Sequence, residues 1–557
     1  MKLRLLLTIV FFTNIILFTS AQVSDDKNPK SWDLGISFEQ ETEIMPFVDE
    51  AKLIREDSLA LIEEFKKPYK FGENIDVSFN LFNSGKWTEL KNGDRIWTLN
   101  IYSAGARSLN FLMNRYSLPE GGELYIYSDD RSSKIGPYTF KENQDDGVLG
   151  TWVVHGDNVW LEYYEPKDVK NLGRISISEV VHGYKPFADP TIKYQKALND
   201  SGACNVDVMC DPNLGSTNGV DWTNVRDNYR HAVGVIIVGG STSCTGTLVN
   251  NVREDGTPYF LTANHCLGNV PDGFGSNYPS NNWAVGFDWF TNTPDCATFS
   301  NTQGPTFSSR IVSGMTLRAN RYASDVALFE LNQTPPSSWN LYYAGWNNSP
   351  VPSSSQLGMH HPSGDIMKLS RYDRTVSSIT VSGIQCWRVA NWDYGVTEGG
   401  SSGSCLIDPQ GRIVGQLLGG GAACSGINDN NQEDWYGKMS VSWSSGFNSA
   451  RRLREWLDPD NSGATTLDGS FENTLGVDDV ESPFQISLFP NPTSGIINLE
   501  TDRNAKYSVL TLSGKMIKSS EVVAGSNTIN LSQYASGIYF IKVTAENATT
   551  VLKVVKE

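Results

Sequence analysis

The sequence is poor in basic residues, in histidine and in long hydrophobic runs. It has 45 Lys and Arg against 62 Asp and Glu, a net charge of −17, and abundant aromatics with only 19% charged residues. Such an acidic surplus argues against a nucleic acid as the partner. Beyond the first residues, no run reaches the roughly 20 apolar residues that a membrane helix needs. The composition predicts a soluble, extracellular, β-rich protein, and the length of 557 residues suggests about three to four domains.

Only the N-terminus has the pattern of a targeting segment. Lys2 and Arg4 precede the apolar run Leu5–Phe18, and small residues end at Ala21. We therefore predict that residues 1–21 are a secretory signal peptide, cleaved before Gln22. A membrane anchor is the alternative, but the apolar run is short for one.

Cysteine is scarce and confined to one stretch of the chain. All eight cysteines lie between Cys204 and Cys424. In an exported chain, an even and clustered set predicts disulfides and marks a separately stabilised domain. The residues alone allow about 105 pairings. We expect no metal site, because no Cys-x-x-Cys pair occurs and only six histidines are present.

Three segments of this stretch point to one chemistry when they are taken together. They are Leu261–Cys266 with His265, Ser324–Leu328 with Asp325, and Gly399–Ser404 with Ser402. A serine hydroxyl is a poor nucleophile until a base takes its proton, and imidazole titrates near neutrality. We predict Ser402 as the nucleophile, His265 as the base and Asp325 as the group that orients the imidazole. The N–H groups of Gly400 and Ser402 are the expected oxyanion hole.

Each of these segments alone is typical of a loop or a strand end. Their combination, with a cysteine after the histidine, predicts an acyl-transfer enzyme. Apolar spacing predicts a helix over 47–67, and alternation predicts short strands over 69–177 in a β-sandwich-like unit. Between the signal and the catalytic stretch, residues 22–196 are most simply a propeptide. A carbohydrate-binding module is the alternative.

The second half of the chain divides at polar segments. We place a processing site at Tyr194–Ala197 and the catalytic domain over 197–459, closed by a helix over 448–457. Residues 460–483 are polar and are expected to be a linker. Alternation returns over 484–557 and predicts a small β-sandwich.

The order His, Asp, Ser is that of chymotrypsin-like serine peptidases, and further segments narrow the resemblance. These are Ser201–Val208, Cys244–Asn251, Tyr259–Ala263, Ala344–Trp346, His360–Pro362 and Gly395–Glu398. The stretch from Cys204 to Pro459 resembles the secreted bacterial lysyl endopeptidases. The resemblance implies a mainly β chain with a chymotrypsin-like double β-barrel, and the triad given above. It also implies a structural role for His360 and His361.

The resemblance also implies disulfides. Its pairs are Cys204–Cys424, Cys210–Cys296 and Cys244–Cys266. Cys386 and Cys405 remain, and we expect them to pair by exclusion. This fourth bridge departs from the family, which has proline where Cys405 stands.

Selection of Lys or Arg needs a carboxylate buried in the primary pocket. The trypsin position, six residues before Ser402, is Val396. The lysyl endopeptidases take the acid from a later segment, which matches Glu433–Gly437 and implies Asp434. A solvated loop aspartate is the alternative. Gly419 and Gly420 are expected on the strand that pairs with substrate.

Two departures from known patterns affect specificity and activation. Leu418 replaces a family histidine, which leaves open whether the enzyme accepts Arg as well as Lys. Ser401 stands where trypsin has an aspartate that pairs with the freed amino terminus. We therefore expect the propeptide to act by steric blocking or as a folding aid.

The final stretch resembles the C-terminal sorting domain of the type IX (Por) secretion system. Leu488–Gly495, Gly537–Val543 and Lys553–Lys556 carry this resemblance. It implies export by that machinery, followed by removal of the domain or attachment at the cell surface. An adhesive module is the alternative for the bare fold.

The expected partners are protein or peptide substrates, the chain's own propeptide and the secretion machinery. The chemistry needs no cofactor. The rival functions are a serine peptidase of another specificity and a catalytically idle, surface-binding homologue.

Overall fold

The computed structural model describes residues 27–60, 68–188, 201–268, 270–294, 296, 310–471, 486–511, 515–545 and 548–556. The chain divides into two compact units, Met1–Glu472 and Asn473–Glu557. The predicted signal peptide and the processing site at 194–197 lie outside the described residues. Within the described ranges, no helix is long and apolar enough to span a bilayer, and no group of His, Cys, Asp or Glu could hold a metal ion.

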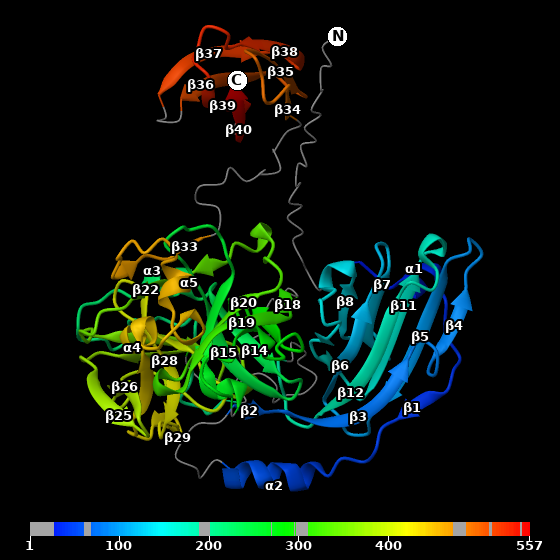
Figure 1. The fold of residues 1–557 in the computed structure, drawn as a ribbon, viewed down its shortest axis with the longest axis vertical. Coiled ribbons are helices and arrows are strands. Elements are labelled where there is room, and N and C mark those ends of the chain that lie inside the picture. The colour runs from blue at the N-terminus through cyan, green and yellow to red at the C-terminus, as the bar shows by residue number, and fades with distance from the viewer. Residues whose placement is uncertain are drawn as a thin grey trace, which may run out of the picture. The chain divides into compact units, whose positions relative to one another are not determined.

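The first part of the larger unit is a sandwich of two sheets, which we call the N-terminal sandwich (Figure 1). One sheet has the order β1 (Thr42–Ile44), β5 (Arg95–Tyr102), β11 (Asn158–Glu165), β7 (Glu123–Ser128) and β8 (Lys134–Tyr138), with β4 (Lys86–Glu89) on β5. The other has the order β10 (Val154–His155), β6 (Ser108–Ser117), β12 (Arg174–Gly183) and β3 (Gly72–Asn80), with β9 (Leu149–Gly150) on β6. The helices before them are α1 (Lys30–Leu34) and α2 (Glu50–Ala60). The expected β-sandwich is confirmed.

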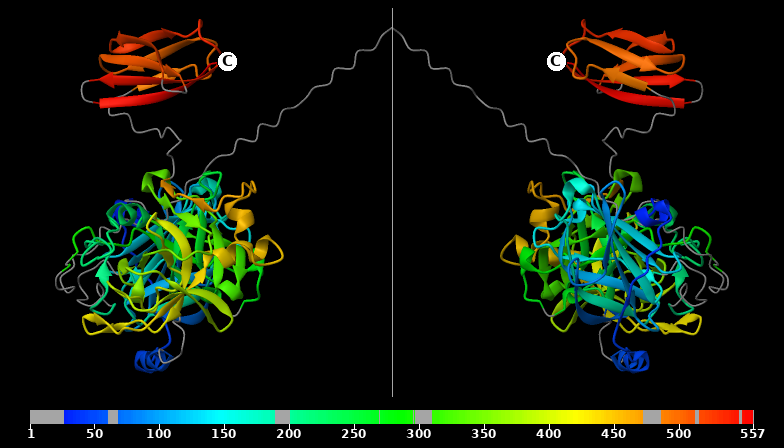
Figure 2. Two further views of the ribbon diagram at one scale, coloured as in Figure 1. Left: turned by 90° about the vertical axis from the view of Figure 1, so that its left-hand side faces the viewer. Right: turned by 90° about the vertical axis from the view of Figure 1, so that its right-hand side faces the viewer.

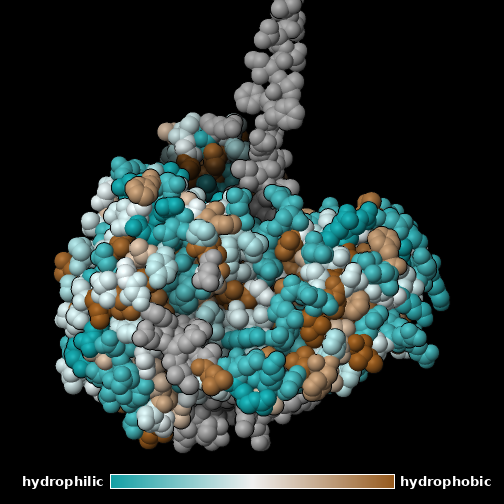
Figure 3. Space-filling model, turned by 60° about the horizontal axis from the view of Figure 1, so that its bottom comes forward, coloured by the Kyte–Doolittle hydropathy of each residue, from teal (hydrophilic) through white to brown (hydrophobic). Residues whose placement is uncertain are grey.

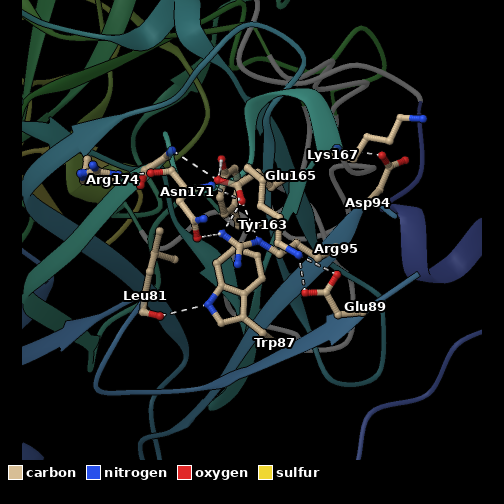
Figure 4. A network of polar contacts seen from close by, with 12 residues as sticks. Leu81, Trp87, Glu89, Asp94, Arg95, Tyr163, Glu165, Lys167, Asn171 and Arg174 are labelled. Carbon is tan, nitrogen blue, oxygen red and sulfur yellow. Dashed lines mark hydrogen bonds and ion pairs between the residues drawn. The ribbon is translucent and has the colours of Figure 1, made fainter. Parts of the chain in front are cut away.

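The sandwich also holds a buried charge on its first sheet. Glu165 has no exposed surface and pairs with Arg95, whose guanidinium lies 3.7 Å from the ring centre of Trp87 (Figure 4). Removing one partner of such a buried pair is strongly destabilising, because the other charge loses its compensation. Loss of either Arg95 or Glu165 is therefore expected to destabilise the sandwich.

Two large, mainly antiparallel sheets form the rest of this unit, which we call the central region (residues 201–471). The first sheet has the order β18 (Ile311–Ser313), β17 (Ala284–Phe287), β14 (Val233–Val238), β15 (Thr242–Val249), β16 (Tyr259–Ala263), β20 (Val326–Leu331) and β19 (Met315–Arg321). The second has the order β13 (Val206–Asp207), β24 (Lys368–Tyr372), β23 (Gln356–His360), β27 (Cys405–Ile407), β28 (Arg412–Gly420), β31 (Asp434–Lys438), β26 (Ile384–Val389) and β25 (Ser377–Val381). This is the expected chymotrypsin-like, mainly β architecture.

Smaller elements complete the central region. They are α3 (Thr223–Tyr229), α4 (Met439–Ser444), α5 (Arg454–Leu457), β21 (Tyr342–Tyr343), β22 (Gly345–Asn347), β29 (Cys424–Ser425) and β30 (Asn428–Asp429). β32 (Thr466–Leu467) pairs with β22, and β33 (Ser470–Phe471) pairs with β21. The described part of the expected linker therefore packs on the central region.

The two expected helices are shorter in the structure. α2 covers 50–60 of the helix expected over 47–67, and residues 61–67 lie outside the described ranges. The helix expected over 448–457 is divided into η8 (Ser449–Arg451) and α5, because Arg452 between them is extended. Leu453 follows it and is fully buried, so the apolar spacing reflects packing as well as helix.

The N-terminal sandwich and the central region share one hydrophobic core. Trp152 and Phe187 of the sandwich cluster with Val235, Trp289 and Ile366 of the central region. A Cβ on Gly286 would lie 2.7 Å from the ring of Trp152, so the two parts meet closely there. Figure 3 shows hydrophilic and hydrophobic residues intermixed over one face of the molecule. Shared burial makes the sandwich an integral part of the larger unit.

The smaller unit is a sandwich of two sheets with its own core (Figure 2). One sheet has the order β34 (Ile486–Phe489), β35 (Ile496–Thr501) and β38 (Gly525–Asn530). The other has the order β37 (Met516–Val522), β36 (Ala505–Thr511), β39 (Gly537–Ala545) and β40 (Ala548–Lys556). Alternating residues such as Ile497, Leu499, Ile541 and Val543 fill the space between them, as the sequence predicted.

Three of the four expected disulfides are present. They are Cys204–Cys424, Cys210–Cys296 and Cys244–Cys266. The expected Cys386–Cys405 bridge is wrong, because both cysteines are free and buried. Cys386 lies on β26 and Cys405 on β27, and the strands β28 and β31 separate them in the sheet. At about 4.8 Å per strand the separation exceeds the reach of a disulfide.

The two free thiols predict a specific alkylation pattern. Burial raises the pKa of the Cys386 thiol and of the Cys405 thiol to about 12, so few thiolates form at pH 8. We expect iodoacetamide to modify neither residue in the native protein and both residues after unfolding without reductant. Peptide mass spectrometry checks this. Disulfide-linked peptides that contain Cys386 and Cys405 would contradict the strand order.

Candidate active site

Asp325 and His265 meet where two paired strands end. Ala263 at the end of β16 pairs with Val326 at the start of β20, so the residues just beyond them share one edge of the sheet. Oδ2 of Asp325 lies 2.8 Å from Nδ1 of His265, and Oδ1 accepts the backbone N–H of His265 at 2.9 Å. The carboxylate thus fixes both the ring and the backbone of the histidine. This is the orientation that a general base requires.

The backbone around Asp325 is strained and held from two sides. Asp325 has a φ of +51°, unusual for a non-glycine residue. Its carbonyl accepts the N–H of Asn264 at 2.9 Å and Nε2 of Gln416 at 3.1 Å. Gln416 lies on β28 of the second sheet, so both sheets fix the aspartate. Strain that neighbours maintain in this way is typical of functional sites.

Ser402 reaches the same place from the second sheet. It lies three residues before β27, and its carbonyl accepts the N–H of Thr245 on β15 at 2.8 Å. A Cβ on Gly403 would lie 2.1 Å from Oγ1 of Thr262 and 2.7 Å from N of Ala263. Both residues belong to the segment that leads to His265. Only glycine permits this close approach. The loop is therefore fixed against the strands that carry the base.

The predicted nucleophile and the predicted base are both enclosed. Oγ of Ser402 and Nε2 of His265 are buried, and neither has a hydrogen-bond partner among the described residues. Hydrogen bonds between catalytic groups are often long in a resting enzyme and tighten when substrate binds. The hydroxyl oxygen of Ser402 and Nε2 of His265 are therefore not engaged by any other described group.

Gly400, the expected oxyanion residue, has a conformation that requires glycine. Its φ is +93°, and a Cβ there would lie 2.8 Å from the carbonyl oxygen of His361 and 3.1 Å from N of Ser363. The backbone of the loop is thereby fixed before substrate arrives. Fixed N–H groups are what oxyanion stabilisation needs, since no reorganisation is then required.

A buried hydrogen-bond chain supports this loop, and the sequence pattern indicated only part of it. Nδ1 of His360 lies 2.8 Å from Oγ of Ser401, and Nε2 lies 2.8 Å from Oγ of Ser370. Ser370 donates to the carbonyl of Val396 at 2.7 Å, so Nε2–H must donate to Ser370. Nδ1 then accepts from Ser401. The ring of His360 therefore fixes Ser401, the residue before the predicted nucleophile.

His361 also has a structural setting. It is fully buried, and its Nδ1 lies 3.1 Å from the carbonyl oxygen of Asp365. Burial lowers the pKa of His361 to about 4, so the ring is neutral at neutral pH. The resemblance implied a structural role for His360 and His361, and these contacts supply one for each.

His360→Phe tests the support of the loop. We expect kcat to fall by about 10- to 100-fold with a smaller change in KM, because a buried hydrogen bond worth about 1–3 kcal/mol is lost. His360→Asn keeps a polar atom near the position of Nδ1 and should recover part of kcat. Active-site titration before the kinetics corrects for misfolded protein. Equal kcat in His360→Phe and wild type would show that the hydrogen-bond chain through His360 does not position Ser401.

Asp434 lies at the start of β31 and has no exposed surface. Its Oδ2 accepts hydrogen bonds from Nε1 of Trp392 at 2.8 Å and from Oγ1 of Thr397 at 2.6 Å. The neighbouring Glu433 is directed elsewhere, to Arg388 and to Nε1 of Trp435. Asp434 is thus a buried acid and not a solvated loop residue.

The glycines expected beside substrate lie next to this acid. Gly420 pairs with Asp434, and Gly419 pairs with Trp435, across β28 and β31. A Cβ on Gly420 would lie 2.3 Å from Oδ1 of Asp434. Any side chain there would collide with the carboxylate, so this position of Asp434 requires a glycine at 420.

Two members of this group were missed as functional residues. Thr397 lies in the segment Gly395–Glu398 that suggested the family, but its hydroxyl had no assigned role. Trp392 is distant from Asp434 in the sequence and carries no motif. Only the pairing of Val389 on β26 with Asp434 on β31 brings its indole to the acid. Val396, at the trypsin position, is apolar and fully buried.

Comparisons with known proteins find relatives for two parts of the chain. Residues 198–437 match the family described as lysyl endopeptidase, C-terminal domain. The lysyl endopeptidase of Pseudomonas aeruginosa is 27% identical over 373 residues, which cover 64% of this chain and 75% of that protein. The protein is a serine endopeptidase. Residues 487–557 match the family described as secretion system C-terminal sorting domain, and the endopeptidase is secreted or held at the cell surface.

Solved structures with similarity to the endopeptidase are distant in sequence. The Rv3671c protease of M. tuberculosis, in its active form, is 14% identical, with a TM-score of 0.25, covering 41% of this chain and 83% of that one. Kallikrein-related peptidase 10 is 15% identical, with a TM-score of 0.25, covering 38% and 91%. The MamO protease domain of Magnetospirillum magneticum is 15% identical, with a TM-score of 0.24, covering 38% and 95%.

Proposed function

We propose that this endopeptidase hydrolyses peptide bonds after lysine, with Ser402, His265 and Asp325 as its triad. Oγ of Ser402 attacks the scissile carbonyl while Nε2 of His265 takes its proton. The N–H groups of Gly400 and Ser402 stabilise the oxyanion. His265 then protonates the leaving amine, and water hydrolyses the acyl-enzyme by the same steps in reverse. The proposal rests most on one observation, the buried carboxylate of Asp434 in the sheet that carries the Ser402 loop.

The hydrogen bonds of Asp434 favour lysine over arginine. Trp392 and Thr397 both donate to Oδ2, and only a glycine fits beside Oδ1. A lysine ammonium is a point charge that one oxygen can bind. A guanidinium binds best as a fork with both carboxylate oxygens, and here it would compete with two existing donors. Lysine therefore fits this acid better.

The remaining parts of the chain take the roles that the sequence suggested. We propose residues 1–21 as the signal, 22–196 as a propeptide removed near Tyr194–Ala197, and 484–557 as the domain that engages the type IX secretion machinery. The substrates are proteins or peptides, and the chemistry needs no cofactor.

Matched peptides that differ only in the residue before the scissile bond test the specificity. We expect kcat/KM for lysine to exceed that for arginine, and both to exceed glutamate and leucine by at least about 100-fold, since an uncompensated buried charge costs several kcal/mol. Preferential cleavage after glutamate or leucine would remove Asp434 as the specificity residue.

A further inference from the structure

One strand next to the N-terminal sandwich joins a sheet of the central region and not a sheet of the sandwich. β2 (Tyr69–Lys70) pairs antiparallel with β15 of the central region, Tyr69 with Ser243 and Lys70 with Thr242. The N–H of Phe71 continues this contact and donates to the carbonyl of Ser241 at 2.9 Å. β3 then begins at Gly72 within the sandwich. A segment of the proposed propeptide is thus an added strand on this sheet. We call it the catalytic sheet, because its strands β16 and β20 lead to His265 and Asp325.

The end of β15 that receives this strand borders the catalytic groups. Cys244 follows Ser243 directly and is bridged to Cys266, the neighbour of His265. Thr245 contacts the nucleophile loop through Ser402, and its hydroxyl donates to the carbonyl of Gly400 at 2.9 Å. A Cβ built on Gly400 would lie 3.3 Å from Cβ of Tyr69. Tyr69 therefore lies directly against the oxyanion glycine.

We infer that β2 occupies the leaving-group side of the active-site cleft and inhibits the endopeptidase as a bound peptide strand. This inference rests on the proposed function. Gly419 and Gly420 on β28 are expected to pair with substrate, whereas β2 is bound on β15. The Ser402 loop contacts both strands, through Thr245 of β15 and Leu417 of β28. Main-chain pairing of this kind is a general mode of peptide recognition.

The sequence explains why such a strand would resist cleavage. Because Tyr69 lies against Gly400, the peptide bond that would reach the oxyanion site lies one or two residues before Tyr69. Counting back along the sequence gives Pro68–Tyr69 or Lys67–Pro68. The first presents a proline to a pocket that contains an acid. In the second, the sequence has a lysine before the bond, but the leaving nitrogen belongs to a proline ring, whose Cδ would hinder delivery of a proton by His265.

Contacts on the far side of the strand hold it in place. The hydroxyl of Tyr69 donates to the carbonyl of Pro186 at 3.2 Å, and the ammonium of Lys185 lies 5.1 Å from the ring centre of Tyr69. Phe71 stacks on Phe187 at 4.2 Å between ring centres, and both are buried. The strand is bound between the catalytic sheet and the end of the sandwich, which limits its release.

The test uses the full-length, unprocessed chain with Pro68→Ala and, as a matched control, Pro46→Ala at an exposed loop position. We expect Pro68→Ala to be cut after Lys67, seen by mass spectrometry, and to gain at least about 10-fold in hydrolysis of a lysyl peptide. Wild type and Pro46→Ala should stay uncut there. The double variant with Ser402→Ala should also stay uncut, which assigns the cleavage to the enzyme itself.

A second readout keeps the inference separate from lysine specificity. Tyr69→Ala should accelerate labelling of Ser402 by phenylmethylsulfonyl fluoride, which carries no lysine, by at least about 10-fold over wild type. If mature enzyme hydrolyses lysyl peptides but Pro68→Ala stays uncut and inactive and Tyr69→Ala labels at the wild-type rate, the inference is wrong. If mature enzyme does not hydrolyse lysyl peptides but Tyr69→Ala labels faster, the proposed specificity fails and the inhibitory strand stands.

Discussion

Replacing Ser402 by alanine is expected to lower kcat by about 10⁵- to 10⁶-fold, the scale seen when a triad nucleophile is removed. The fold should persist, because the contacts that fix this loop do not involve the hydroxyl of Ser402. The carbonyl of Ser402 accepts from Thr245, and Gly403 packs against Thr262. Steady-state kinetics on a lysyl peptide measure the loss, and the KM of the residual reaction should change little.

Ser404→Ala is the matched control for this variant. Ser404 lies in the same loop and is equally buried, and its backbone bonds to Ser401 and Leu417 do not involve its hydroxyl. We expect Ser404→Ala to keep kcat within a few-fold of wild type. Similar losses in both variants would indicate that the loop had collapsed. Near wild-type activity of Ser402→Ala would exclude Ser402 as the nucleophile.

Asp434→Asn is expected to lower kcat/KM for lysyl peptides by about 30- to 5,000-fold, corresponding to the 2–5 kcal/mol lost when one partner of a buried charge pair is removed. Asparagine keeps the size of the side chain and an oxygen that can accept from Trp392 and Thr397. The fold and the triad should therefore be preserved. Hydrolysis of a leucyl peptide should be unchanged or improved, because no uncompensated carboxylate remains. Paired kinetics on the two peptides measure this shift.

Glu433→Gln provides the control for Asp434→Asn. It removes an acid one residue away that pairs with Arg388 and accepts from Trp435. We expect the preference for lysine to survive this change. Equal loss for lysyl and leucyl peptides in Asp434→Asn would mean that Asp434 supports the structure and not the specificity.

Local motifs predicted the parts of the site that can be recognised from neighbouring residues in the sequence. His265 and Asp325 lie at strand ends, and Ser402 lies in a glycine-rich turn. Each position can be recognised from the residues beside it in the sequence. The alternating strands over 69–177 and 484–557 were also foreseeable, because burial between two sheets imposes a period of two residues.

Features that depend on strand order could not be foreseen. Cys386 and Cys405 seemed paired because each lacked a partner, but β28 and β31 lie between their strands. Trp392 reaches Asp434 only through the pairing of β26 with β31, and β2 joins β15 although its own sandwich begins two residues later. The tertiary arrangement determines each of these contacts, and no local pattern encodes it.

The most direct test of the central claim is covalent trapping of mature enzyme with a lysyl diphenylphosphonate, followed by peptide mass spectrometry. We expect one phosphonyl adduct, on Ser402, formed much faster than with the glutamyl and leucyl analogues. Asp434→Asn should slow the lysyl reaction alone. An adduct at another residue, or equal rates for all three reagents, would contradict the assignment of Ser402 and Asp434.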